Sequence, residues 1–269
     1  MRYLFLCLLV LGLFQSCKQE NHDENLIWYD EFNEDSKVLS EKWNVIIGNG
    51  CPEFCGFGNN ELQYYTNSKQ NLKVEDGKLV ITAIMHKGDS GFTSAKLSSQ
   101  NKGDWQYGYF EIRAKLPTGT GTWPAFWMLP SQDKRLEWPL DGEIDIMEHV
   151  GYNPGTIYGT VHTKTYNNNR GNQKSDSILI ADATSKYHIY AIDWQEHSIS
   201  WFVDNEVYHT IDRNKDDYEA WPFSKPFHLI INLAIGGNWG GEHGVDHLIF
   251  PQAMMVDYVR VFKEKPVKK

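Results

Sequence analysis

Residues 137–151, EWPLDGEIDIMEHVG, place three carboxylates in an apolar stretch that is otherwise typical of a β-strand. Glu143 and Asp145 alternate with two isoleucines, as the two faces of a strand require. Glu148 comes one residue too late for this alternation. A β-bulge with Met147 as the extra residue would return Glu148 to the face of Glu143. The stretch therefore predicts a bulged strand that carries three acids on one face.

The spacing of these acids suits the chemistry of a glycosidase. With one inserted residue, Glu143 and Glu148 stand like positions i and i+4, which places their Cα atoms roughly 13 Å apart at ~3.3 Å per residue. Their side chains can lean toward each other over Asp145 and close most of that gap. A retaining glycosidase needs its carboxyl groups about 5–5.5 Å apart and an inverting one about 6.5–9.5 Å, so the spacing permits the retaining geometry.

Three acids on one strand face repel one another, so we expect at least one of them to keep its proton near neutral pH. Such an acid can protonate a leaving oxygen while a neighbouring carboxylate attacks the sugar carbon. A solvated edge strand is a poorer interpretation, because Ile144 and Ile146 indicate a buried opposite face. A divalent metal site is a further alternative, since carboxylates also suit calcium.

The rest of the chain predicts an all-β fold. Helical periodicity is nearly absent, and Gly, Pro, Asn and Asp clusters separate short β-rich runs. We expect strands near residues 27–32, 43–47, 78–86, 105–116, 122–129, 143–150, 156–163, 187–194, 198–203, 206–211, 226–235 and 253–262. Asp204 and Asn205 predict a two-residue hairpin turn. Evenly spaced strands predict a β-sandwich or jelly roll, and without an internal linker we expect one domain over residues 26–269.

The first residues predict export. Arg2 precedes a dozen mostly apolar residues, a segment that fits a signal peptide over residues 1–16 and is too short to span a membrane. The segment ends in Ser16-Cys17, which resembles a bacterial lipobox. We expect Cys17 to carry lipid, residues 17–25 to form a polar tether, and the anchor to hold the protein at the outer membrane, on the cell surface or the periplasmic face. A plain signal peptide cut nearby is the alternative.

The number of cysteines and the net charge of the chain limit which metals and macromolecules it can bind. Besides Cys7 and Cys17, the chain has one close pair, Cys51 and Cys55, for which we expect a disulfide in an exported protein. A zinc site would need more ligands. The formal net charge of −9 argues against a nucleic-acid partner, which requires a basic face.

Within the acidic stretch, the segment GEIDIMEHVG resembles the E-x-D-x-x-E signature of glycoside hydrolase family 16. It is similar to the laminarinase-like branch of that family, which carries the extra bulge residue. Supporting stretches are WYDEFN, GFGNNELQYYT, YGYFEIRAKLP, WPAFWMLP, VHT, NLAIGGNW and MMVDYVRVF. The resemblance implies a jelly-roll sandwich with a substrate cleft on its concave sheet. It also implies that Glu143 is the nucleophile, Glu148 the general acid/base and Asp145 the helper between them, with no cofactor for catalysis.

The resemblance further implies a set of residues that bind the sugar: Asn60, Arg113, Trp123, Trp127, Trp138 and His162. Each has a structural alternative. The three tryptophans and His162 could belong to the core, Asn60 could serve only as a turn residue, and Arg113 could form an ordinary ion pair.

A structural calcium is implied in the same way, with Glu31, the carbonyl of Gly77 and Asp257 as its ligands; the alternative is that these acids are simply solvated. Calcium accepts oxygen ligands from separated strands.

The expected function is therefore that of a retaining endo-β-glucanase, monomeric, acting on neutral β-1,3 or mixed β-1,3/1,4-glucan. A non-catalytic glycan-binding protein on the same fold is an alternative. A transglycosylase is another, because it would use the same residues and differ only in whether water or sugar intercepts the glycosyl-enzyme.

Overall fold

The computed structural model describes residues 24–33, 36–88, 91–132, 135–214 and 217–267. The predicted signal peptide and Cys17 lie outside these residues, as does most of the predicted tether. Within the described part of the chain, no helix is both long and apolar enough to cross a bilayer.

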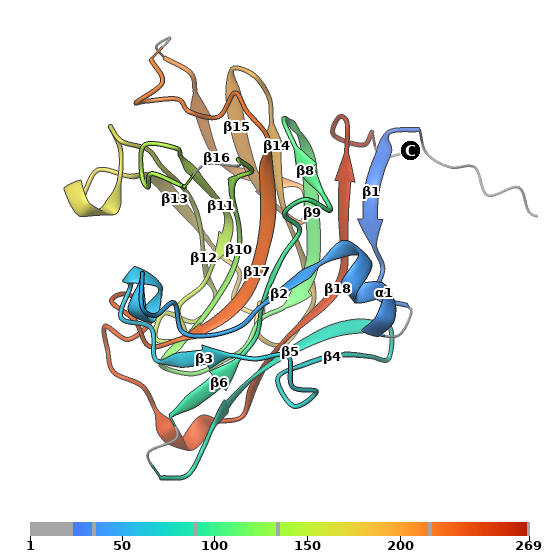
Figure 1. Cartoon of the computed structure of the whole chain (residues 1–269). Coiled ribbons are helices and arrows are strands. Elements are labelled where there is room, and N and C mark those ends of the chain that lie inside the picture. Colours follow the sequence, from blue (N-terminus) through green and yellow to red (C-terminus); the bar gives the residue numbers. More distant parts are fainter. Residues whose placement is uncertain (1–23, 34–35, 89–90, 133–134, 215–216, 268–269) are drawn as a thin grey trace, which may run out of the picture.

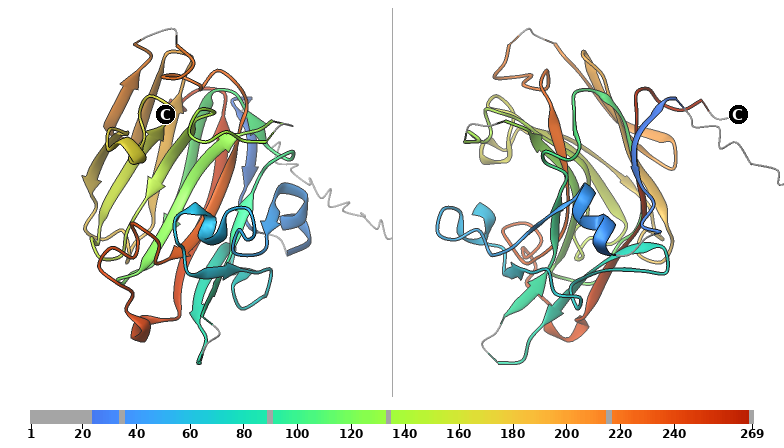
Figure 2. Two further views of the ribbon diagram at one scale, coloured as in Figure 1. Left: turned by 60° about the vertical axis from the view of Figure 1, so that its left-hand side comes forward. Right: turned by 45° about the vertical axis from the view of Figure 1, so that its right-hand side comes forward.

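Two antiparallel-rich sheets stack face to face (Figure 1 and Figure 2). The outer sheet has the strand order β16 (Glu206–Asp212), β15 (Ser198–Val203), β14 (His188–Trp194), β9 (Gly108–Lys115), β18 (Gln252–Phe262), β5 (Lys78–Met85), β6 (Phe92–Ser94) and β3 (Gln63–Tyr65), with β1 (Leu26–Asp30) beside β18 and β4 (Leu72–Glu75) beside β5. The inner sheet has the order β13 (Lys174–Leu179), β12 (Thr156–His162), β11 (Glu143–Glu148), β10 (Thr122–Pro130), β17 (Phe227–Ile235), β7 (Lys96–Ser98) and β2 (Asn44–Ile46), with β8 (Asp104–Trp105) beside β17.

Helical elements are short. They are α1 (Ser36–Lys42) and three turns of 3₁₀ helix, η1 (Cys55–Gly58), η2 (Asn168–Arg170) and η3 (His247–Ile249). The core lies between the sheets, where Phe110 and Ile112 of β9 belong to the same buried cluster as Leu229 and Ile231 of β17. This arrangement confirms the predicted all-β sandwich.

Alternation along β10 and β17 leaves the other face of the inner sheet open. In β17, Leu229 and Ile231 point into the core, so His228 and Asn232 point to the open face. Trp123 and Trp127 of β10 are only half-buried and lie on that same face. The inner sheet therefore presents a row of polar and aromatic side chains to solvent, and this is the face on which the acids of β11 lie.

Most of the expected strands are present, and the hairpin at Asp204 and Asn205 is confirmed by the left-handed φ values of 49° and 75° at these residues. The additional strands are short or exposed. β7 has three residues, and β13 is an exposed edge strand at residues outside the expected strands.

Candidate active site

A bulge in β11 brings the three acids together, as predicted. Glu143 pairs with His162 and Asp145 with Thr160, whereas Glu148 pairs with Tyr158, so two residues of β11 oppose Gly159 alone. On the other side, Asp145 pairs with Trp127 and the next pair is Met147 with Phe126. The residue that β11 inserts relative to β10 is therefore Ile146, and the prediction that it is Met147 was wrong.

A side chain of the outer sheet reaches across the core and hydrogen-bonds to the backbone of this bulge. The indole nitrogen of Trp201, on β15, donates a 2.7 Å hydrogen bond to the carbonyl oxygen of Asp145. Gly159 leaves room for that ring, because a Cβ there would lie 2.4 Å from Trp201 Cδ1. A bulge interrupts the hydrogen bonds of a strand, and here the buried carbonyl of Asp145 accepts its hydrogen bond from the outer sheet.

Glu143 and Glu148 each accept a hydrogen bond from a tryptophan. Trp138 Nε1 donates to Glu143 Oε2 at 2.7 Å, and Trp123 Nε1 donates to Glu148 Oε1 at 3.1 Å. These bonds fix the orientation of both carboxyl groups. The bond to Glu143 gains strength when that carboxylate is charged. Of the two rings, Trp138 is the more exposed, and it lies at the edge of the cleft.

Asp145 lies between the glutamates and is almost fully buried. Its Oδ2 is 3.3 Å from Nε2 of His162. Ligand atoms of Glu143, Asp145 and His162 all lie within 4.8 Å of one another. This set includes an imidazole and leaves out Glu148, so it differs from the all-carboxylate calcium site that the sequence leaves as an alternative.

Burial and neighbouring negative charge raise the pKa values of two of these acids. Burial raises the pKa of Asp145 well above its usual range, and the charge of Glu143 and a hydrogen bond to Glu143 raise it further. Burial also raises the pKa of Glu148 well above its usual range, with the charge of Asp145 as the next cause. The raised pKa of Asp145 favours a carboxyl group that shares a hydrogen bond with Glu143, and the raised pKa of Glu148 favours the protonated form that an acid catalyst needs.

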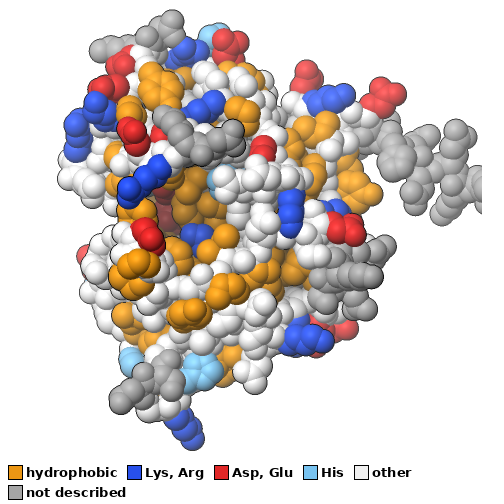
Figure 3. All heavy atoms as spheres, viewed as in Figure 1, with side chains coloured by type: hydrophobic (Ala, Val, Ile, Leu, Met, Phe, Trp, Pro, Cys, Tyr) orange, Lys and Arg blue, Asp and Glu red, His pale blue; other side chains and the backbone are white. Residues whose placement is uncertain are grey.

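Trp127 and Asn232 form the floor of the site. Trp127 Nε1 donates to Asn232 Oδ1 at 2.6 Å, and Asn232 Nδ2 donates to the Tyr65 hydroxyl at 3.1 Å. Figure 3 shows a hollow on this face of the molecule, lined mostly by hydrophobic side chains with acidic and basic ones at its floor. An apolar hollow with a few polar groups is the usual form of a small-ligand or sugar site.

One end of the cleft is aromatic. Trp239 packs edge-on against Trp123 at 5.7 Å and against Tyr158 at 5.0 Å between ring centroids. Sequence reasoning did not single out Trp239, although a tryptophan in a Gly-rich loop after a strand is a usable signal. Asn60 lies at this end, but its side-chain amide donates to Asn238 Oδ1 at 2.7 Å. Its contact with sugar stays a prediction.

A buried aspartate anchors the loop that carries Trp138. Asp141 accepts 2.9 Å hydrogen bonds from Lys225 Nζ and from the Tyr218 hydroxyl, and a 2.8 Å bond from the backbone N–H of Glu137. Burial alone would raise the pKa of Asp141, but these bonds hold it well below its usual range. The loop is therefore fixed where it aims the indole of Trp138 at Glu143.

Trp138→Phe should lower kcat/KM about 10-fold, because it removes a hydrogen bond to a charged carboxylate and keeps an aromatic ring. Steady-state kinetics on a soluble β-glucan will measure this change in kcat/KM. Trp28→Phe is the matched control, since Trp28 packs against Trp43 and Trp105 away from the cleft. A normal kcat/KM for Trp138→Phe would mean that the ring, and not its N–H, matters.

Arg113 does not belong to the site, and the prediction that it contacts sugar was wrong. It lies on β9 of the outer sheet, where its neighbours Ile112 and Ala114 point into the core. Arg113 therefore points to the outside, and its guanidinium forms an ion pair with Asp257. The structural ion pair was the correct alternative.

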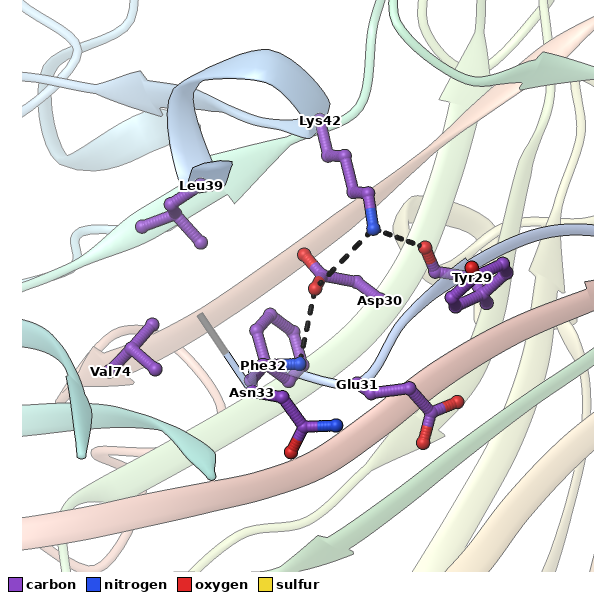
Figure 4. Close-up of a pocket in the computed structure, with 8 residues that line it drawn as sticks. All are labelled: Tyr29, Asp30, Glu31, Phe32, Asn33, Leu39, Lys42 and Val74. Carbon is purple, nitrogen blue, oxygen red and sulfur yellow. Dashed lines mark hydrogen bonds and ion pairs between the residues drawn. The ribbon is translucent and has the colours of Figure 1, made fainter. Parts of the chain in front are cut away.

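The residues of the predicted calcium site have other partners. Arg260 binds both oxygens of Glu31, at 2.7 and 3.0 Å, and Asp257 pairs with Arg113. Glu31 lines a cavity of about 200 Å³, in which it lies with Asn33 at one side while Asp30 and Lys42 pair at another (Figure 4). The turn at Gly77 lies beside Asn33, and calcium binding here stays a prediction.

Cys51 and Cys55 form the expected disulfide. It closes the loop that leads through η1 to Asn60, so the loop at this border of the cleft is covalently restrained.

Comparison with known proteins identifies the family. Residues 59–260 match the family described as Glycosyl hydrolases family 16. A beta-glucanase of Rhodothermus marinus is 47% identical over 248 residues, which are 88% of this chain and 85% of that protein. A glucan endo-1,3-beta-glucosidase of Cryptopygus antarcticus is 41% identical over 232 residues, which are 81% of this chain and 83% of that protein. The X-ray structure of the laminarinase from Rhodothermus marinus matches with a TM-score of 0.84 and 45% identity over 90% of this chain and 98% of that one. The chain belongs to glycosyl hydrolases family 16.

Proposed function

We propose that the protein is a retaining endo-β-glucanase that hydrolyses β-1,3 or mixed β-1,3/1,4-glucan. The observation that carries this proposal is the bulged strand, which presents Glu143, Asp145 and Glu148 to one cleft with an indole donor on each glutamate. The names of the relatives, a beta-glucanase and a glucan endo-1,3-beta-glucosidase, support the substrate class.

The reaction takes two displacements. A carboxylate oxygen of Glu143 attacks the anomeric carbon while Glu148 gives its proton to the departing glycosidic oxygen, which leaves a glycosyl ester on Glu143. Glu148, now a carboxylate, takes a proton from water, and the water oxygen displaces Glu143 from the same carbon. Two inversions preserve the β configuration. Asp145 and Trp138 hold Glu143 in place for both steps.

The substrate should be neutral, because the chain has a formal charge of −9 and the cleft offers the rings of Trp123, Trp127 and Trp138 to pyranose faces. Products from laminarin, cereal mixed-linkage glucan and cellulose, compared side by side, test the assignment. Activity on cellulose alone would overturn the substrate. Binding of glucan without release of reducing ends would favour the glycan-binding alternative, and products longer than the substrate would favour transglycosylation.

We propose that Cys17 carries a lipid anchor, on the strength of the apolar segment that ends in Ser16-Cys17. A single acyl chain binds membranes only marginally, whereas a lipidated N-terminal cysteine supplies several chains. Cys17→Ala should therefore move the protein from the membrane fraction to the soluble fraction, as followed by immunoblotting. Unchanged fractionation of this variant would count against the anchor.

We propose, separately, that calcium stabilises the fold near Glu31, Gly77 and Asp257. A bound ion stabilises the native state by mass action, so added calcium should raise Tm and a chelator should lower it. Thermal unfolding of one preparation under both conditions measures the effect. A Tm that responds to neither would leave the two acids with their arginine partners alone.

A further inference from the structure

Lys96 lies in the same row of the inner sheet as the acid catalyst. It pairs with Asn232 of β17, Asn232 pairs with Ala125 of β10, and Ala125 pairs with Glu148 of β11. Residues directly opposite each other in an antiparallel sheet point to the same face. The side chain of Lys96 therefore points to the cleft face of the inner sheet, as that of Glu148 does.

Two aromatic rings hold the Lys96 ammonium. Its Nζ lies 4.7 Å from the ring centroid of Trp127 and 4.6 Å from that of Phe57, within the range of a cation–π interaction. The charges that act on it are those of Glu61 and Glu143. Lys96 is thus placed against the tryptophan of the cleft floor, where the negative charges of Glu61 and Glu143 act on it.

The donors of this ammonium are unused by the protein. Among the described residues, none accepts a hydrogen bond from Lys96 Nζ or forms an ion pair with it within 4.0 Å. Glu61 is instead engaged by Gln63 at 2.6 Å and by Tyr65 at 3.4 Å. Because an ammonium has three donors and no acceptor, and its desolvation is costly without acceptors, a ligand with oxygen lone pairs fits this position.

We propose that Lys96 is a substrate-binding residue, whose ammonium donates hydrogen bonds to hydroxyl oxygens of the glucosyl unit that lies against Trp127 beside Glu143. The inference rests on the proposed function, since it takes the ligand to be a neutral glucan. The rings of Trp127 and Phe57 hold the cation by its charge and leave N–H groups for the sugar. A charged donor that is partly desolvated gives a stronger hydrogen bond to a hydroxyl than a solvated one.

The test measures glucan binding apart from turnover. In a Glu143→Gln background, Lys96→Met should weaken the Kd for a β-1,3-gluco-oligosaccharide at least about 10-fold, the loss typical of a charged hydrogen bond. In the otherwise unchanged enzyme, the same substitution should raise KM by a similar factor and change kcat less. Lys96→Arg, which keeps a cation, should recover part of the affinity.

Lys265→Met is the matched control. It also removes an ammonium from an aromatic ring, that of Phe202 at 3.6 Å, but on the outer sheet, and it should leave Kd and KM unchanged. If Lys96→Met does not fold, Lys96→Gln gives the same comparison of Kd and KM, because glutamine is uncharged and has a shorter side chain.

The outcomes separate the two proposals. A folded Lys96→Met protein with normal Kd, or one in which only Tm falls, would overturn the role of Lys96 while the enzyme still cuts glucan. An enzyme that binds glucan but never cuts it would overturn the proposed function, and the Kd comparison would still decide on Lys96. Failure of the parent protein to bind any glucan would overturn both.

Discussion

Glu143→Gln is expected to abolish glucan hydrolysis, lowering kcat about 10⁴-fold or more, while the Kd for glucan changes little. Glutamine keeps the shape of the side chain but its amide oxygen is a poor nucleophile, so the glycosyl ester cannot form. The indole of Trp138 can still donate to that oxygen, which preserves the local packing. Release of reducing ends and calorimetric binding of a gluco-oligosaccharide measure the two quantities on one preparation.

Chemical rescue identifies the role of Glu143 more sharply than loss of activity does. In Glu143→Ala, azide can occupy the space of the carboxylate and attack the anomeric carbon of an activated aryl glycoside directly. One inversion then yields an α-glycosyl azide, which NMR distinguishes from the β product. A β-glycosyl azide from this variant would show that Glu143 is not the nucleophile. In the parent enzyme, α-anomeric product early in the reaction would overturn retention itself.

Glu148→Gln should lower kcat about 10²- to 10⁴-fold on glucan, the range typical of losing a general acid. The loss should be much smaller for the first step with an aryl glycoside, whose phenolate leaves without a proton. Pre-steady-state release of the phenol, followed by slow turnover, is the expected signature. Equal losses on glucan and on the aryl glycoside would contradict the assignment of Glu148 as the acid.

The pH dependence gives an independent check on Glu148. The reaction needs its protonated form, and burial raises the pKa of Glu148 well above the usual range. Activity of the parent enzyme should therefore persist toward neutral pH and fall as the pH rises through that raised pKa. Glu148→Gln has no proton to lose at this position, so the residual activity should lack that descending limb.

The sequence predicted what depends on local pattern. The alternation of apolar and polar residues predicted the long strands. The one-residue delay of Glu148 in that alternation predicted the bulge. The inserted residue, Ile146, could not be chosen over Met147, because both are apolar and only pairing with β10 separates them. The family identity followed from several stretches that agree with one another, and it is confirmed by the comparisons.

Residues whose role depends on distant pairing were harder to place. Arg113 alternates correctly within its strand, but the side on which it lies depends on which sheet receives β9, and that is set by contacts with β14 and β18. Lys96 was missed because a strand of three residues has no readable period. Asn232 was missed because it follows a run of apolar residues that predicts only burial.

The bond from Trp201 to the carbonyl of Asp145 has a consequence for engineering the protein toward heat resistance. Repacking a hydrophobic interior is a common route to a higher Tm, and Trp201 is a fully buried residue that such a search would vary. Its substitution would also release the backbone that sets the orientation of Asp145, and would disturb the hydrogen bond between Asp145 and Glu143. Selection for thermostability alone should therefore accumulate slow enzymes whenever it alters Trp201, whereas a screen that retains activity should preserve this tryptophan even though no sugar approaches it.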